Sequence, residues 1–311
     1  MKYAIISDIH GNIHAFEAVL ADAKAQNVDK YLLIGDYATM HPFGNEVAER
    51  IRTLENAVVV RGNGEDHLIN LLGKTPEEMT SKQFFPTYWS FNSLSAENRE
   101  YITTLPEAAT ITDGGWKIHL QHASNLFFSL PRSEFFYSYG FSKMMIAEPF
   151  THQEYLTRAK CALLSNPENV AEILQMSKGI YLFGHNHLQF HMENEGRIFI
   201  NPGSCGDARN WDNRAQYTIL TIDDAQWHAD ERRIEYDIAK AVEGMQSTGY
   251  AEYTPAWSKV MEYEVRSGKD YFISFLPHIT AIGEKMGISP AHGNNEVYDE
   301  AVKTWDIEGA Y

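Results

Sequence analysis

The chain has 311 residues, 44% of them apolar, which is enough for a full core in one elaborated domain or in a domain with an appendage. Its formal net charge of −16 gives a mostly negative surface, which argues against polymeric nucleic acid and anionic lipid as partners. Two unpaired cysteines exclude a disulfide framework, and no apolar stretch is long enough for a secretory signal or a bilayer span, so we expect a cytoplasmic protein without a membrane partner.

The first part of the chain alternates short apolar runs with helical patterns. Residues 3–7 form an apolar run, and residues 12–25 place apolar side chains at helical spacing. The same order recurs twice, with apolar runs and then helical patterns at 31–34 and 46–54, and at 57–60 and 65–72. Such strand and helix units predict a largely parallel sheet covered by helices.

Short β-prone runs separated by glycine or asparagine turns follow later, at residues 117–120, 180–183, 190–193, 198–200 and 217–222. They predict a second set of strands. We therefore expect an α/β fold in which two sheets pack face to face as a β-sandwich, with helices outside, in four layers ordered α/β/β/α. This domain should end near residue 223.

Two stretches do not fit that sandwich. Residues 124–178 form an insertion within the 1–223 domain, and residues 224–311 form a C-terminal, mostly helical extension. The insertion's aromatic residues predict either a lid over the site or, as the commoner role, core or subunit interface: Phe127, Phe128, Phe135, Phe136, Tyr137, Tyr139 and Phe141. The extension is open to three roles, namely covering the sheet, burying the interface of a homo-oligomer, or roofing the active site.

Side chains that can bind metal ions follow the carboxyl ends of five predicted strands: Asp8, His10, Asp36, Asn63, His122, His185 and His187. The carboxyl ends of parallel strands share one edge, so these residues should meet in one crevice. Oxygen and imidazole donors without sulfur favour manganese or iron, with zinc and nickel as alternatives. Seven donors fit two ions about 3.5 to 4 Å apart, with Asp36 as the bridging carboxylate.

These residues occur as blocks in the order D-x-H, G-D, G-N, H and G-H-x-H, and in this the chain resembles the calcineurin-like metallophosphoesterase family. Residues 201–204 also resemble a segment of its bacterial branch related to diadenosine tetraphosphate hydrolases. The resemblance covers roughly residues 1–223. It implies that Asp36 bridges two ions, the first held by Asp8, His10 and His187 and the second by Asn63, His122 and His185.

The resemblance also implies hydrolysis of a phosphate ester by a hydroxide that bridges the two ions. Gly64 departs from the family, because a histidine that protonates the leaving group often follows the metal-binding asparagine. Without that donor, a small phosphodiester or phosphoanhydride such as a nucleotide is a better substrate than an ester with a basic alkoxide leaving group. His14, His41 and His67 are substitute donors, although solvated or helix-facing histidines are the commoner explanation.

Arg61 also follows an apolar strand. Its guanidinium is suited to gripping a phosphate oxygen, and an ion pair with a structural role explains it equally well.

Two alternatives to this enzyme remain open: a serine/threonine-type protein phosphatase or phosphomonoesterase, and a noncatalytic metal-binding scaffold of the same fold, as in a retromer subunit. The complete set of metal ligands argues against the scaffold, because clustered carboxylates and imidazoles are costly to bury without use.

Overall fold

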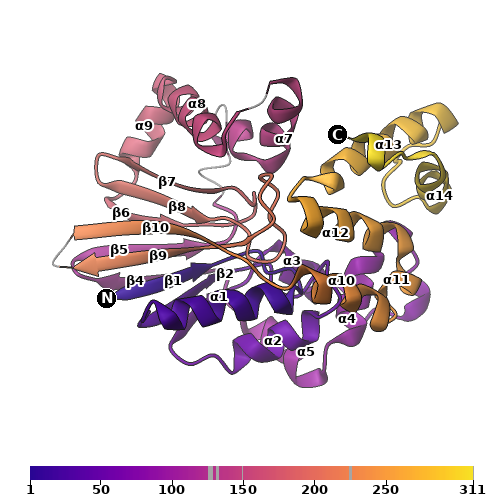
Figure 1. Cartoon of the computed structure of the whole chain (residues 1–311), viewed down its shortest axis with the longest axis horizontal. Coiled ribbons are helices and arrows are strands. Elements are labelled where there is room, and N and C mark those ends of the chain that lie inside the picture. The colour runs from indigo at the N-terminus through magenta and orange to yellow at the C-terminus, as the bar shows by residue number, and fades with distance from the viewer. Residues whose placement is uncertain (125–128, 131–132, 149, 224–225, 311) are drawn as a thin grey trace.

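The structure is a computed structural model that describes residues 1–124, 129–130, 133–148, 150–223 and 226–310. Two five-stranded mixed sheets pack face to face, and helices cover the outer face of each (Figure 1). The predicted four-layer α/β/β/α sandwich is therefore confirmed.

The first sheet has the order β10-β9-β1-β2-β3. Strands β1, β2 and β3 are parallel, with Ile5 beside Leu32 and Leu32 beside Val58, while β9 and β10 join antiparallel at the other edge. The strands are β1 (Lys2–Ile6), β2 (Lys30–Ile34), β3 (Ala57–Val60), β9 (Ala215–Asp223) and β10 (Gln226–Ile234).

The second sheet has the order β4-β5-β6-β8-β7. Strands β5, β6 and β8 are parallel, whereas β4 and β7 are antiparallel to their neighbours at the two edges. The strands are β4 (Ala108–Asp113), β5 (Trp116–Gln121), β6 (Gly179–Leu182), β7 (Gln189–Asn194) and β8 (Arg197–Pro202).

Strands β4 and β10 were not predicted from the sequence, and β10 carries the sandwich beyond residue 223, where we expected it to end. Both lie at a sheet edge, and both are partly exposed along most of their length. An edge strand that faces solvent needs few apolar residues, so the apolar pattern that marks a buried strand is weak there.

The helices of the first half pack on the outer face of the first sheet. Because side chains alternate along β1, Tyr3 and Ile5 face the second sheet, whereas Ala4 and Ile6 pack against α1. The side chain of Asn12 caps α1 by accepting a hydrogen bond from the Ala15 N–H. The helical elements are α1 (Ile13–Ala25), α2 (Gly44–Arg52), α3 (Asn63–Ile69), η1 (Pro76–Glu78), η2 (Lys82–Phe84), α4 (Phe85–Ser93) and α5 (Ala96–Thr104).

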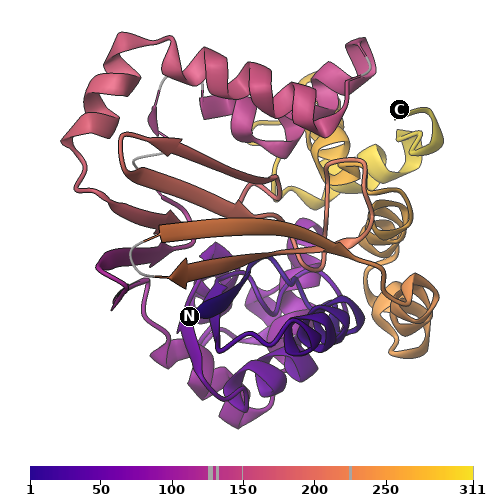
Figure 2. The same ribbon diagram turned by 60° about the vertical axis from the view of Figure 1, so that its left-hand side comes forward.

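The aromatic insertion covers the outer face of the second sheet (Figure 2). Phe136 is fully buried and packs on Phe190 of β7, with ring centroids 4.9 Å apart, and Phe141 packs on Tyr155. Phe127 and Phe128 lie outside the described residues. The described helices of the insertion are η3 (Ser133–Phe136), α7 (Ser138–Ala147), α8 (His152–Leu164) and α9 (Pro167–Gln175).

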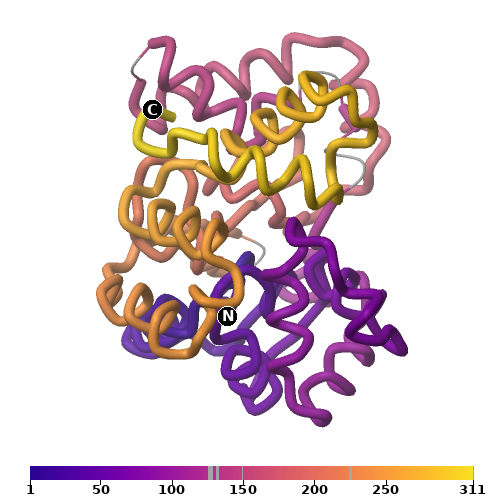
Figure 3. Tube along the Cα trace, turned by 90° about the vertical axis from the view of Figure 1, so that its right-hand side faces the viewer, coloured from indigo at the N-terminus to yellow at the C-terminus, as the bar shows by residue number. Residues whose placement is uncertain are grey.

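The C-terminal extension is a helical layer across one end of the sandwich (Figure 3). It has its own apolar core, in which Trp257 packs against Phe275 and Tyr298. Its helices are α10 (Ile238–Ser247), α11 (Tyr250–Tyr253), α12 (Pro255–Ser267), α13 (Tyr271–Met286), α14 (Asn295–Thr304) and η4 (Glu308–Ala310). Among the described residues, no helix combines the length and the apolar character that a bilayer crossing needs.

Candidate metal centre

The structure brings the seven predicted ligands together at one end of the sandwich. Four follow β1, β2 and β3 of the first sheet, and three follow β5 and β6 of the second sheet, so the crevice is shared by two sheets rather than formed by the edge of one. Two groups have ligand atoms within 4.8 Å of one another: Asp8, His10 and His187, and Asp36, His122 and His185. The seventh residue, Asn63, begins α3, and its Oδ1 lies 2.8 Å from Nδ1 of His185.

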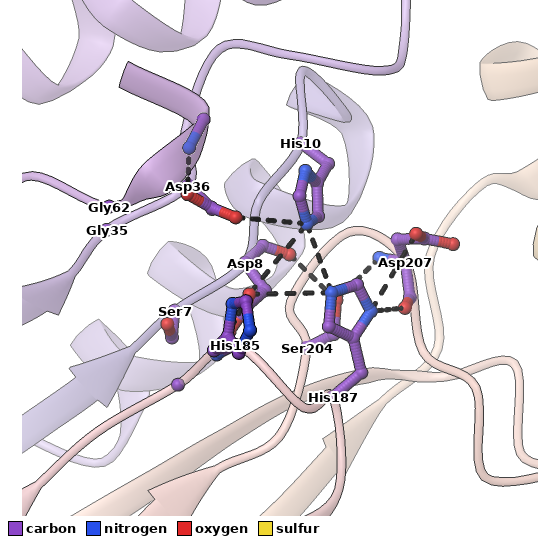
Figure 4. Close-up of polar contacts among 12 residues, drawn as sticks. Ser7, Asp8, His10, Gly35, Asp36, Gly62, His185, His187, Ser204 and Asp207 are labelled. Carbon is purple, nitrogen blue, oxygen red and sulfur yellow. Dashed lines mark hydrogen bonds and ion pairs between the residues drawn. The ribbon is translucent and has the colours of Figure 1, made fainter. Parts of the chain in front are cut away.

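Two carboxylates lie between these groups. Oδ2 of Asp36 is 3.3 Å from Nε2 of His122 in its own group and 3.9 Å from Nε2 of His10 in the other. Oδ1 of Asp8 is 3.4 Å from Nε2 of His187 and 3.9 Å from Nε2 of His122. Figure 4 shows Asp8, His10, Asp36 and His187 turned toward one another. The two groups therefore form one continuous cluster, with Asp36 where a bridging ligand is expected.

The backbone at these ligands is strained. Of the ten non-glycine residues with positive φ in the described part of the chain, five are predicted ligands: Asp8, His10, Asp36, His185 and His187. A left-handed conformation costs a non-glycine residue on the order of 1 kcal/mol, and such residues gather where function requires a fixed geometry. Glycine permits the tight loops, because a Cβ at Gly184 would lie 2.0 Å from Oγ of Ser7. The strained backbone lowers the stability of these loops and orients the side chains toward one another.

Hydrogen bonds on the far side of two rings fix their orientation. Nδ1 of His122 lies 2.6 Å from the carbonyl oxygen of Ile34, and Nδ1 of His187 lies 2.6 Å from that of Asp207. A carbonyl oxygen only accepts, so each Nδ1 carries a proton and leaves Nε2 to face the cluster. Nε2 of His187 also lies 3.1 Å from Nε2 of His10, a close approach that a cation between the two nitrogens would stabilise.

The charges of the cluster favour a cation. Burial raises the pKa of Asp8 to about 7. Burial alone would lower the pKa of His122, but the carboxylates of Asp36 and Asp8 outweigh it and raise this pKa to about 10. The His122 ring in turn holds the pKa of Asp36 below its usual value, against the effect of burial. Buried carboxylates in this arrangement need a positive partner, and the oxygen and nitrogen donors fit divalent cations.

A set of buried polar residues braces the ligand loops. Oγ of Ser204 donates to the carbonyl oxygen of Asp8 at 2.7 Å and accepts from the N–H of Asp207 at 2.8 Å. Nδ2 of Asn201 donates to the carbonyl oxygen of Gly184 at 2.9 Å. The carboxylate of Glu65 accepts from the N–H of Asp36 at 2.8 Å. Neither Glu65 nor Asp207 carries a functional signal in the sequence, and residues 201–204 were marked only through the family resemblance.

Gly64 is explained by the close approach of two loops. Its N–H donates to Oδ1 of Asp36 at 2.6 Å. A Cβ at this position would lie 2.9 Å from Oγ1 of Thr39 and 3.0 Å from Oδ1 of Asp36, so a larger residue would displace Thr39. Glycine here therefore lets the α3 loop support the Asp36 carboxylate.

The cluster opens into a cavity of about 250 Å³ between the ligand loops and the C-terminal extension. Metal ligands form one end, and Arg209 lines the cavity beside them. The remaining wall is largely apolar and is formed by Met40, Phe84 and Pro86, which the sequence did not place at the site, and by Trp257 and Phe272 of the extension, for which roofing the site was one of three open roles. The extension thus roofs the site, whereas no described residue of the insertion lines this cavity, so the predicted lid role is not supported.

Two predicted catalytic residues are not brought to this cavity. Arg61 forms ion pairs with Asp66, at 2.7 Å, and Glu107, at 2.6 Å, which agrees with the structural explanation rather than a phosphate contact. His14 lies on α1 with its ring edge on Phe43, with centroids 5.4 Å apart.

The other two substitute proton donors differ in their placement. His41 is buried away from the cavity lining, whereas His67 lines the cavity.

Comparison with known proteins agrees with this geometry. The profile of the calcineurin-like phosphoesterase superfamily domain matches residues 1–225. An uncharacterized protein of Methanocaldococcus jannaschii is 28% identical over 256 residues, which cover 77% of this chain and 90% of that protein.

Two crystal structures share the fold. A metallophosphoesterase from Sphaerobacter thermophilus superposes with a TM-score of 0.58 at 24% identity, over 86% of this chain and all of that chain. A hypothetical protein of Pyrococcus horikoshii also gives 0.58, at 16% identity, over 82% of this chain and 97% of that chain.

Proposed function

The chain belongs to the calcineurin-like phosphoesterase superfamily, and on that premise we propose that it hydrolyses a small phosphodiester or phosphoanhydride with two metal ions. The observation that carries this proposal is the pair of adjacent ligand groups with the Asp36 carboxylate between them. Asp8, His10 and His187 would hold one ion, and Asn63, His122 and His185 the other. Manganese and iron suit these donors, with zinc and nickel as alternatives.

Bound ions of this kind lower the pKa of water and neutralise phosphate charge. The chain's own part is to hold the ligands rigidly through the bonds to Ile34, Asp207 and Ser204, so that little reorganisation is needed during the reaction. Trp257 and Phe272 of the C-terminal extension also cover one side of the site.

We assign His67 as the proton donor to the leaving group. It lies four residues after Asn63 on α3, hence on the same face of the helix, and it lines the cavity. A proton from His67 would replace the one that the family's histidine supplies at position 64. Because His67 lies one turn farther along α3 than that histidine would, we favour leaving groups of low basicity, such as the phosphate of a nucleotide.

The test is metal-dependent hydrolysis. Protein freed of metal and reloaded with manganese, iron, zinc or nickel is assayed with bis-p-nitrophenyl phosphate and p-nitrophenyl phosphate. We expect turnover of the diester, and loss of activity to background in Asp36→Asn. The matched control is Asp230→Asn, an exposed carboxylate on β10, which should behave as wild type.

Three results would count against the proposal. Cleavage of phosphomonoesters or phosphopeptides alone would favour the phosphatase alternative. Full activity in Asp36→Asn would remove Asp36 from the metal centre, and inactivity with every metal would favour the noncatalytic scaffold.

A further inference from the structure

We propose that the C-terminal extension builds an aromatic subsite beside the metal centre, which binds a planar ring carried by the substrate, as in a nucleobase or a phenyl ester. This inference rests on the proposed phosphoesterase function and names the substrate class of the same site. The subsite consists of Phe84, Trp257 and Phe272, which share the cavity with metal ligands His10 and Asp36.

The three aromatic residues come from η2, α12 and α13, two of which lie beyond the 1–225 family domain. The Trp257 and Phe272 rings pack at 5.4 Å with an interplanar angle of 31°. Phe84 is 45% exposed, an unusual exposure for a large apolar side chain that lines a cavity. A ring inserted here would cover apolar surface that otherwise faces water.

A polar feature of the same wall also points to a ligand. The Trp257 side chain is only 1% exposed, and its indole N–H has no hydrogen-bond partner among the residues that the structure describes. Buried indole N–H groups normally find an acceptor, so a ligand acceptor that reached Trp257 from the adjoining cavity would satisfy a donor that the described residues leave unpaired. Nucleobases carry both a planar ring and such acceptors.

Arg209 connects the aromatic wall to the metal centre through a chain of contacts. The guanidinium of Arg209 lies over the Phe272 ring, 5.2 Å from its centroid, and pairs with the Asp207 carboxylate at 2.5 Å. Asp207 in turn accepts from Nδ1 of the metal ligand His187 through its carbonyl oxygen. The extension also contacts the Arg209 guanidinium through Asp270, at 3.5 Å, and Glu264, at 3.6 Å.

This chain of contacts fixes the distance between the metal ligands and the aromatic wall. A substrate that places its phosphate on the ions and its ring on Phe84 and Phe272 would satisfy both ends of the cavity at once. Recognition of the ring would then select substrates by the group next to the phosphate, while the ions act on the phosphate alone.

The experiment measures binding of phosphonates, whose carbon–phosphorus bond resists hydrolysis, to the manganese-loaded protein by titration calorimetry. We compare methylphosphonate, cyclohexylphosphonate and phenylphosphonate, and then methylenediphosphonate with adenosine 5′-(α,β-methylene)diphosphate. We expect phenylphosphonate to bind about tenfold more tightly than methylphosphonate, or the adenosine analogue about tenfold more tightly than methylenediphosphonate, or both. Phenylphosphonate should also exceed cyclohexylphosphonate, because stacking requires a planar ring.

Variants locate the gain. Phe84→Ala and Phe272→Ala should lose the tighter binding of the planar-ring ligand while keeping the affinity for methylphosphonate. Phe272→Leu keeps apolar volume but not the ring, so it should lose the tighter binding with an unchanged thermal unfolding midpoint. The matched control is Phe135→Ala, a partly buried aromatic residue of the insertion, which should keep the full gain.

The outcomes separate this inference from the function on which it rests. Equal affinity for the planar-ring ligands and their ringless parents overturns the subsite. So does a result in which Phe135→Ala alone loses the tighter binding of the planar ring. If ringless phosphonates do not bind with any metal but the ring-bearing ones do, the subsite stands and the phosphoesterase proposal fails. A gain only in the adenosine series identifies a nucleobase, and a gain only with phenylphosphonate identifies a smaller ring.

Discussion

Replacing Ser204 by alanine should weaken both the fold and the metal centre. Ser204 is fully buried, and its hydroxyl joins the loop that follows β8 to the loop that carries Asp8. In Ser204→Ala the carbonyl oxygen of Asp8 keeps a second donor, the N–H of Gly206 at 3.0 Å, but the N–H of Asp207 loses the hydroxyl oxygen that accepts its hydrogen bond. One buried N–H left unsatisfied costs about 1–3 kcal/mol, so the free energy of unfolding should fall by that amount.

The same change should reduce manganese affinity by about 10- to 100-fold, because residues that orient metal ligands have effects of this size. Urea unfolding of the metal-free protein gives the first number, and calorimetric titration with manganese gives the second. Ser93→Ala, at an exposed serine on α4, is the control and should change neither. If Ser204→Ala unfolds and binds manganese like wild type, the bracing role is refuted.

Three further predictions concern residues outside the ligand set. Arg61→Ala should keep kcat/KM for the diester and lower the free energy of unfolding by at most about 1 kcal/mol, because its ion-pair partners Asp66 and Glu107 are largely exposed to solvent. A large fall in kcat/KM would instead indicate that Arg61 contacts the phosphate. His67→Ala should slow aryl phosphodiesters more as the phenol becomes more basic, and a uniform effect across the series would remove it as the proton donor. Burial, reinforced by Arg233, lowers the pKa of His152 to about 4, so the folded state loses stability as pH falls from about 6.5 toward 4. His152→Gln should flatten that fall in chemical unfolding, and an unchanged slope would contradict the assignment.

The sequence predicted which polar residues cluster at the site better than it predicted the surroundings of the site. The predicted ligands follow buried strands, whose apolar runs are clear, and each lies within five residues of the end of its strand. Strands β4 and β10 were not predicted, because edge strands are as exposed as loops and lack the apolar pattern of a buried strand.

The sequence did not show which segment covers the site, for a different reason. Both the insertion and the extension are rich in aromatic residues, and composition alone does not say which segment faces the ligands. Only tertiary packing turns Phe136 toward the second sheet and Phe272 toward the cavity. Glu65, Ser204 and Asp207 act through backbone groups of distant loops, which leave no spacing pattern in the chain.

The most direct test of the metal centre is anomalous diffraction from crystals grown with excess manganese. The account predicts two peaks in one cavity, one among Asp8, His10 and His187 and the other among Asn63, His122 and His185, with the Asp36 carboxylate touching both. A single peak, or two peaks that Asp36 does not join, would contradict it.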